Sequence, residues 1–164
     1  MDNGLEHENT FAVIGAGMSG VLAGIKLMEA GYPFQIFEKA DRVGGTWREN
    51  TYPGIACDVP SHIYSYSFEL NPDWSEFTSP GSEVQEYFER VSKRYGVDSH
   101  IRFNEAVTRC TWMGDRWEIE TEKGNVEHFR WVIAATGILH HPKYPEIEGH
   151  RMFCIQTSCV KHYG

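Results

Sequence analysis

The clearest chemical signal in the chain is a glycine-rich turn between two apolar runs. Gly15, Gly17 and Gly20 follow the run Phe11–Ile14, and Glu38 closes the next run. After a strand, the first glycine permits a tight turn, the second admits a pyrophosphate, and the third lets a helix pack closely. The pyrophosphate would face helix N–H groups and the positive end of the helix dipole. The spacing of these glycines predicts a dinucleotide site. Glu38 could bind a ribose but would repel a 2′-phosphate, so it favours FAD or NAD over NADP.

Three later segments also suit a bound cofactor. The run Gly-Gly-Thr-Trp at 44–47 has glycines whose amides could reach a phosphate or ribitol, although a flexible surface loop is the alternative. Residues 52–64 form a proline-bracketed segment with several aromatic side chains and the carboxylate of Asp58. This carboxylate could lie at the cofactor; the alternative is that it only caps its own loop by accepting hydrogen bonds from nearby N–H groups. Residues 134–137, Ala-Ala-Thr-Gly, would let the chain pass close to a cofactor.

Over about residues 8–149, these segments together resemble the N-terminal portion of class B flavoprotein monooxygenases. The run Tyr-Pro-Gly-Ile-Ala-Cys-Asp-Val-Pro-Ser-His-Ile-Tyr-Ser at 52–65 is more similar to Baeyer–Villiger monooxygenases than to flavin monooxygenases acting on soft heteroatoms. The resemblance implies FAD as cofactor, NADPH as reductant, and oxidation of a small-molecule ketone by O₂ to an ester or lactone.

The resemblance also implies which residues hold FAD. Those at the ADP half are Gly15, Gly17, Ser19, Gly20 and Glu38. Those along the rest of the cofactor are Thr46, Trp47, Asp58, Tyr64 and Val107, and further cofactor-binding candidates are Lys39, Gly45, Thr136 and Gly137. Asp58 is also the candidate catalytic residue, because it matches a family aspartate near the flavin ring that helps to orient a catalytic arginine.

The chain departs from the family pattern in length and at its end. Family members are far longer and carry a second glycine fingerprint for NADPH, which the 164 residues lack. Ile155 and Cys159 stand where the family has Gly and His, so we expect a truncation or frameshift near residue 153. We therefore interpret 1–164 as a single, partial FAD-binding domain with an aberrant tail at 150–164 and without an NADPH domain.

Two alternatives remain at this stage. The chain could be a non-catalytic FAD- or NAD-binding remnant, or an inert truncated gene product. Because the resemblance covers little beyond the ADP-holding half of the cofactor site, we expect the chain alone to be inactive as an enzyme.

Composition excludes several other classes of function. The formal net charge of −8 argues against binding to nucleic acid or anionic membranes. The four cysteines form no C-x-x-C pair, so neither a zinc site nor a thioredoxin-like site is supported, and we expect no metal site. No apolar stretch is long enough to span a membrane, and the polar N-terminus does not resemble a signal peptide. These features favour a cytoplasmic protein.

The elements that position these residues indicate an α/β fold. We expect an incomplete three-layer, Rossmann-like FAD/NAD(P)-binding domain, with a parallel sheet and an antiparallel β-meander as the outer layer. The expected parallel strand order is 101–103, 34–37, 11–14 and 131–136, and the expected meander strands are 106–112, 116–120 and one from 126. Helices are expected over 18–30 and from an N-cap at Ser82, with Gln85 completing a capping box and Gly96 ending the helix.

Overall fold

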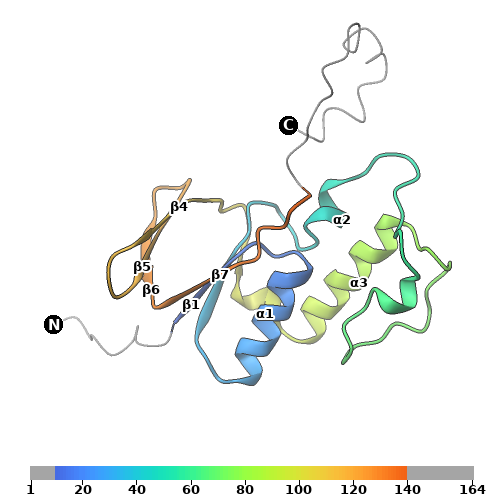
Figure 1. Cartoon of the computed structure of the whole chain (residues 1–164), viewed down its shortest axis with the longest axis horizontal. Coiled ribbons are helices and arrows are strands. Elements are labelled where there is room, and N and C mark those ends of the chain that lie inside the picture. The colour runs from blue at the N-terminus through green and yellow to red at the C-terminus, as the bar shows by residue number, and fades with distance from the viewer. Residues whose placement is uncertain (1–9, 140–164) are drawn as a thin grey trace, which may run out of the picture. The chain divides into compact units, whose positions relative to one another are not determined.

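The computed structural model describes residues 10–139, so the expectations for the tail at 150–164 lie outside the described residues. The chain divides into two compact units. The first contains residues up to Gly45 together with Phe88–Thr136, and the second contains Thr46–Tyr87 together with the residues from Gly137. Figure 1 labels the α-helices and most of the strands.

A parallel sheet forms the centre of the first unit. It contains β1 (Phe11–Ile14), β2 (Phe34–Phe37), β3 (Ile101–Arg102) and β7 (Trp131–Ala134), in the order β3-β2-β1-β7. All three pairings are parallel, so the strand order expected from the sequence is confirmed. The near-continuous apolar runs suit this position because a central parallel strand is covered on both faces.

Helix α1 (Met18–Glu29) links β1 to β2. Gly24 lets the helix lie close to its neighbours, since a Cβ there would stand 2.8 Å from Val97 Cγ1 and 3.0 Å from Ile36 Cδ1. Gly31, with a φ of +73°, follows the end of the helix as expected, and its amide donates to the Met28 carbonyl. Positive φ costs glycine little, so it suits a helix C-terminus.

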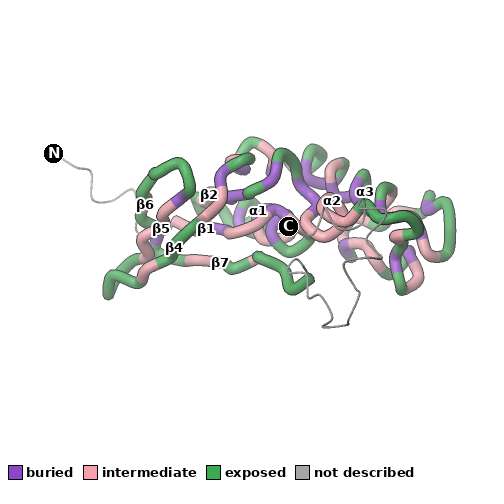
Figure 2. Tube along the Cα trace, turned by 90° about the horizontal axis from the view of Figure 1, so that it is seen from above, coloured by how far each residue is buried: buried purple, intermediate pink, exposed green. Residues whose placement is uncertain are grey.

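The meander covers the parallel sheet as a separate layer. Its strands β4 (Val107–Trp112), β5 (Trp117–Thr121) and β6 (Val126–Phe129) are antiparallel in the order β4-β5-β6. Ile119 and Phe129 pack in one buried cluster with Ala12 and Phe37 of the parallel sheet. The expected outer layer is confirmed, while much of β4 stays exposed (Figure 2).

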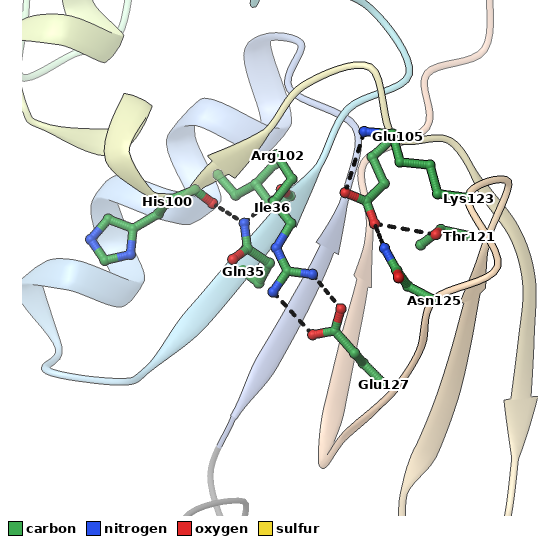
Figure 3. Close-up of polar contacts among 9 residues, drawn as sticks. All are labelled: Gln35, Ile36, His100, Arg102, Glu105, Thr121, Lys123, Asn125 and Glu127. Atoms are coloured by element: carbon green, nitrogen blue, oxygen red, sulfur yellow. Dashed lines mark hydrogen bonds and ion pairs between the residues drawn. The ribbon is translucent and has the colours of Figure 1, made fainter.

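Polar side chains also join the meander to the parallel sheet (Figure 3). Arg102 of β3 forms a two-pronged ion pair with Glu127 of β6, which raises the pKa of the arginine. Glu105 is 5% exposed and accepts hydrogen bonds from Asn125 Nδ2 at 2.8 Å and Thr121 Oγ1 at 3.2 Å. The Asn125 hydrogen bond is the largest cause that lowers the pKa of the Glu105 carboxyl.

Helix α3 (Gly81–Arg94) starts two residues earlier than the capping-box pattern predicts, since an N-cap at Ser82 would place the first helical residue at Glu83. The amides of Glu83 and Val84 both donate to the Pro80 carbonyl, so Ser82 lies inside the first turn and is not the N-cap. The predicted cap is therefore wrong. Glu83 instead accepts hydrogen bonds from the amide and hydroxyl of Ser75, which lower the pKa of its carboxyl.

The rest of α3 agrees with the sequence pattern. Its apolar stripe is almost completely buried, and a 3-10 turn, η2 (Val97–His100), follows Gly96. Gly96 adopts a φ of +73° and donates its amide to Lys93, so it ends the helix as expected. The buried stripe consists of Val84, Tyr87, Phe88 and Val91.

The second unit turns the long connection after residue 45 into ordered structure. It contains α2 (Thr46–Glu49) and a 3-10 turn, η1 (Ser61–Ile63). Ser61 is fully buried; its amide donates to the Phe77 carbonyl at 2.7 Å, and its hydroxyl accepts from the Ser79 amide. Tyr87 O–H donates to the Glu69 carbonyl. These bonds give the segment the backbone partners that a disordered loop lacks.

The buried contact between meander and sheet predicts a stability difference between two apolar positions. Replacing Ile119, which is fully buried, by alanine is expected to lower the free energy of unfolding by about 2–5 kcal/mol because it leaves a cavity. Val126→Ala is the control, since Val126 is 54% exposed; it is expected to cost less than about 1 kcal/mol. Urea unfolding followed by circular dichroism measures both, and equal losses would contradict the assigned core.

The lowered pKa of Glu105 predicts a pH-dependent contribution to stability. A carboxyl whose folded-state pKa lies below its unfolded value of about 4.3 stabilises the fold above that pH, and the contribution is lost as pH falls through the folded pKa. Glu105→Gln is therefore expected to be less stable than the unchanged chain at pH 7, with the difference narrowing on acidification. Urea unfolding at several pH values measures the difference, with the exposed Glu29→Gln as control; a gap independent of pH would refute this assignment.

Candidate functional site

The glycine turn of the first unit is shaped by close backbone contacts. Gly15 has a φ of +99°, and a Cβ on it would lie 2.6 Å from the Ala135 carbonyl oxygen. A Cβ on Gly20 would lie 1.9 Å from the Gly15 carbonyl oxygen. Because real Cβ atoms do not approach backbone this closely, both positions require glycine, and α1 starts directly against the turn.

The turn leaves backbone donors at the start of α1. The amide of Gly15 donates to the Phe37 carbonyl at 2.8 Å, so it serves the sheet. Across residues 10–139, the amides of Gly17, Ser19 and Gly20 donate to no protein acceptor. No side chain caps α1, and its first turn carries no acidic residue. Unpaired amides at the positive end of a helix dipole are a binding site for a phosphate-like anion.

Glu38 lies beside these donors, with its side chain directed at the turn. The residue is 5% exposed, and its Oε2 accepts a hydrogen bond from the Ala16 amide at 2.6 Å. Its Oε1 accepts from the Ala40 amide at 2.8 Å. A carboxylate has about four lone-pair sites, so Glu38 keeps the capacity to accept from a ribose hydroxyl as well.

The second glycine pair packs against the first turn. The Gly44 amide donates to the Ala16 carbonyl at 3.1 Å. A Cβ on Gly45, whose φ is +53°, would lie 3.1 Å from Gly17 Cα. This segment is therefore held against the glycine turn, which disfavours the alternative of a flexible surface loop.

The remaining candidates of the first unit differ in their surroundings. Thr136 lies near the turn, because its Cα is 3.7 Å from a Cβ built on Gly15. Ser19 and Lys39 are exposed. Val107 begins β4, and its side chain packs against the buried cluster that joins meander and sheet. A contact between Val107 and a cofactor would thus involve its backbone.

The second unit brings two of its candidate residues into direct contact. The Trp47 indole N–H donates to the Tyr64 hydroxyl at 3.0 Å, and the rings meet edge to face with centroids 5.4 Å apart. The pKa of the Tyr64 hydroxyl lies above its ordinary value, chiefly because the side chain is partly buried. The Trp47 hydrogen bond lowers this pKa, and the charges of Cys57 and Asp58 raise it.

Three other candidates of the second unit occupy more open positions. Asp58 is exposed, and Gly137 is exposed with a φ of +74°. Thr46 begins α2, and its carbonyl accepts from both the amide and the side chain of Asn50. The polar group that Thr46 uses here therefore belongs to its backbone.

Sequence reasoning missed the two residues whose amides bind Glu38. Ala16 and Ala40 contribute only backbone N–H groups, which every residue except proline carries. The position of Ala16 between two motif glycines was the signal that marked it as part of the turn. Nothing in the residue type of Ala40 distinguishes it.

Two kinds of feature are absent from the described residues. Across residues 10–139, His, Cys, Asp and Glu side chains form no group of three or more that could hold a metal ion. In the same range, no helix has both the length and the apolar character needed to cross a lipid bilayer.

Comparisons with known proteins give the site a context. A family model described as an NAD(P)-binding Rossmann-like domain matches residues 13–80. A Baeyer–Villiger monooxygenase of Streptomyces coelicolor is 44% identical over 152 residues, covering 88% of this chain and 29% of the relative. The structure of cyclohexanone monooxygenase from Rhodococcus sp. Phi1 bound to NADP+ matches with a TM-score of 0.80 and 36% identity, over 85% of this chain and 28% of that one.

This chain is similar in sequence and fold to part of the Baeyer–Villiger and cyclohexanone monooxygenases. The structure of the enzyme OTEMO in complex with FAD and NADP also matches, with a TM-score of 0.80 and 32% identity over 87% of this chain and 28% of OTEMO. The Rossmann-like fold expected from the sequence is confirmed. The chain spans less than a third of the length of each of these three proteins.

Two glycine substitutions are expected to separate folding from ligand binding in the turn. A Cβ on Gly17 would lie 3.5 Å from Gly45 Cα, an ordinary contact, so Gly17→Ala is expected to fold. Its methyl group would obstruct the approach of a pyrophosphate, weakening dinucleotide binding about tenfold or more. Gly20→Ala is expected to lose stability outright, because its Cβ would overlap the Gly15 carbonyl.

Calorimetric titration with FAD and thermal unfolding measure the two effects of these substitutions. Gly17→Ala that binds FAD as tightly as the unchanged chain would refute the role given to this position. Gly20→Ala that unfolds at an unchanged temperature would refute the close packing of α1 on the turn.

Proposed function

We propose that this chain is the FAD-binding segment of an NADPH- and O₂-dependent Baeyer–Villiger monooxygenase. The observation that carries the proposal is the group of amides at Gly17, Ser19 and Gly20, set at the start of α1 beside the buried carboxylate of Glu38. The likeness to a Baeyer–Villiger monooxygenase and to a structure containing FAD supports the choice of cofactor.

The residues of the first unit fit the ADP half of FAD. The amides of Gly17, Ser19 and Gly20 would donate to the diphosphate, with the α1 dipole adding favourable charge. Glu38 would accept from the hydroxyls of the adenosine ribose. The same carboxylate would lie against the 2′-phosphate of NADP, so we assign this first site to FAD and not to NADP.

The residues of the second unit would bind the rest of the cofactor. The contact between Trp47 and Tyr64 orients two aromatic side chains, and the exposed carboxylate of Asp58 is available to orient a cationic catalytic group. Bound FAD supplies the redox chemistry, transferring electrons from NADPH to O₂ so that one oxygen atom enters the ketone and the other leaves as water.

The length of the chain sets how much of the reaction we assign to it. It spans 29% of the Streptomyces relative. We therefore assign FAD binding to this segment, and ketone oxidation to an enzyme of the relatives' full length. The unpaired thiols of Cys57 and Cys110 support the further proposal of a cytoplasmic location, where thiols stay reduced.

Binding of FAD to the purified chain tests the proposal. We expect one FAD per chain by absorbance after gel filtration, displacement by ADP, and weaker competition by 2′-phospho-ADP because Glu38 repels its extra phosphate. Gly17→Ala is the control that keeps the fold but obstructs the diphosphate.

The outcomes separate the competing functions. Binding of NAD without FAD would indicate a dinucleotide-binding remnant, and a folded chain that binds neither would refute the assigned site. NADPH consumption stimulated by a ketone, measured on a protein of the relatives' full length that contains this segment, tests the monooxygenase assignment.

A further inference from the structure

The carboxylate of Glu38 already has two partners in the chain without any ligand. Its oxygens accept from the amides of Ala16 and Ala40, both at 2.8 Å or less, and the side chain is buried. Burying a carboxylate costs free energy unless the carboxylate is hydrogen-bonded, so these two contacts help to offset the cost of burying Glu38. The same two contacts also tie the Glu38 side chain to the backbone on both sides of it in the sequence, at Ala16 and at Ala40.

The peptide units around Ala16 are held from two sides. The Ala16 amide donates to Glu38, and its carbonyl accepts from the Gly44 amide at 3.1 Å. Glu38 thus binds the amide of Ala16, the residue between Gly15 and Gly17. The amide of Gly44, in the second glycine pair, binds the carbonyl of the same residue.

The backbone of Glu38 is fixed independently of its side chain. Its amide donates to the Arg102 carbonyl at 3.0 Å, and its carbonyl accepts from the Glu105 amide at 2.9 Å. The Ala40 carbonyl accepts from Asn104 at 2.9 Å. The carboxylate therefore extends from a rigid strand end, which lets it define where the turn lies.

We propose that Glu38 is a positioning residue that assembles the glycine turn before a dinucleotide arrives, by holding the amides of Ala16 and Ala40. Because the Ala16 amide is used by Glu38, the diphosphate must bind through the amides of Gly17, Ser19 and Gly20. This role deepens the proposed function. The statement about the diphosphate rests on that function, whereas the positioning of the turn does not.

Amide hydrogen exchange on the ligand-free chain tests the positioning role directly. In Glu38→Gln, the side-chain amide can accept through only one oxygen and presents N–H donors to the other backbone amide. We expect at least one of the Ala16 and Ala40 amides to exchange about tenfold faster or more, because it loses a charge-assisted hydrogen bond, with core amides such as Ile119 unchanged. Glu29→Gln, at an exposed ion pair with Lys26, is the control and is expected to alter neither.

Two outcomes would overturn the proposal. Unchanged exchange at Ala16 and Ala40 would show that the carboxylate does not hold the turn. A uniform increase over all amides would show only a general loss of stability. Should Glu38→Gln fail to fold, the unchanged chain decides the matter, because the proposal requires the Ala16 amide to be protected and the neighbouring Gly17 amide to exchange near the rate of an unstructured peptide.

A pair of nucleotides separates positioning from ribose binding. ADP carries both ribose hydroxyls, and 2′,3′-dideoxy-ADP carries neither but keeps the diphosphate. If Glu38 positions the turn, Glu38→Gln weakens both ligands, with the loss for the dideoxy compound about tenfold. Removing a negative charge near a diphosphate would by itself strengthen binding, so a loss has the opposite sign from a charge effect.

The nucleotide experiment also distinguishes this proposal from the proposed function. A loss confined to ADP would show a ribose ligand only and would overturn the positioning role. If the unchanged chain binds neither nucleotide, the proposed function fails, while hydrogen exchange still decides whether Glu38 assembles the turn.

Discussion

A buried carboxylate bonded to backbone amides is the interaction on which the proposed dinucleotide site depends. Glu38 bonds Ala16, which lies 22 positions earlier in the sequence, and it does so from the end of β2, where that strand pairs with β3. Charge-assisted hydrogen bonds are shorter and stronger than neutral ones, and burial strengthens them further. The position of the glycine turn is therefore set by an interaction at its centre as well as by the strand before it.

The layers around the sheet support this interaction from a distance. Strand β2, which ends just before Glu38, pairs with β3, and Arg102 of β3 is joined to Glu127 in the meander. The meander also packs Ile119 and Phe129 onto Phe37, the residue before Glu38. A partly buried ion pair contributes little by itself, but here it accompanies an apolar contact that fixes the same strand end.

The second unit relies on a different kind of support. Its aromatic side chains contact one another in pairs, and Tyr87 joins them to the backbone through its hydroxyl. Aromatic side chains bury large areas with few rotatable bonds, so they can order a segment that contains little regular structure. This explains how the connection between 46 and 80 stays folded with only α2 and η1 as regular elements.

The sequence by itself determined the sheet order and the glycine turn, because both follow from local rules. Apolar runs mark buried strands, a single helix between parallel strands returns right-handedly, and glycines spaced as Gly15, Gly17 and Gly20 after a strand mark the turn. The start of α3 and the partners of Glu38 were decided only by the tertiary structure. The Pro80 carbonyl, not Ser82, receives the first amides of α3. Glu38 meets Ala16 only because β1 and β2 pair in one register, and no residue type at Ala16 or Ala40 announces a backbone donor.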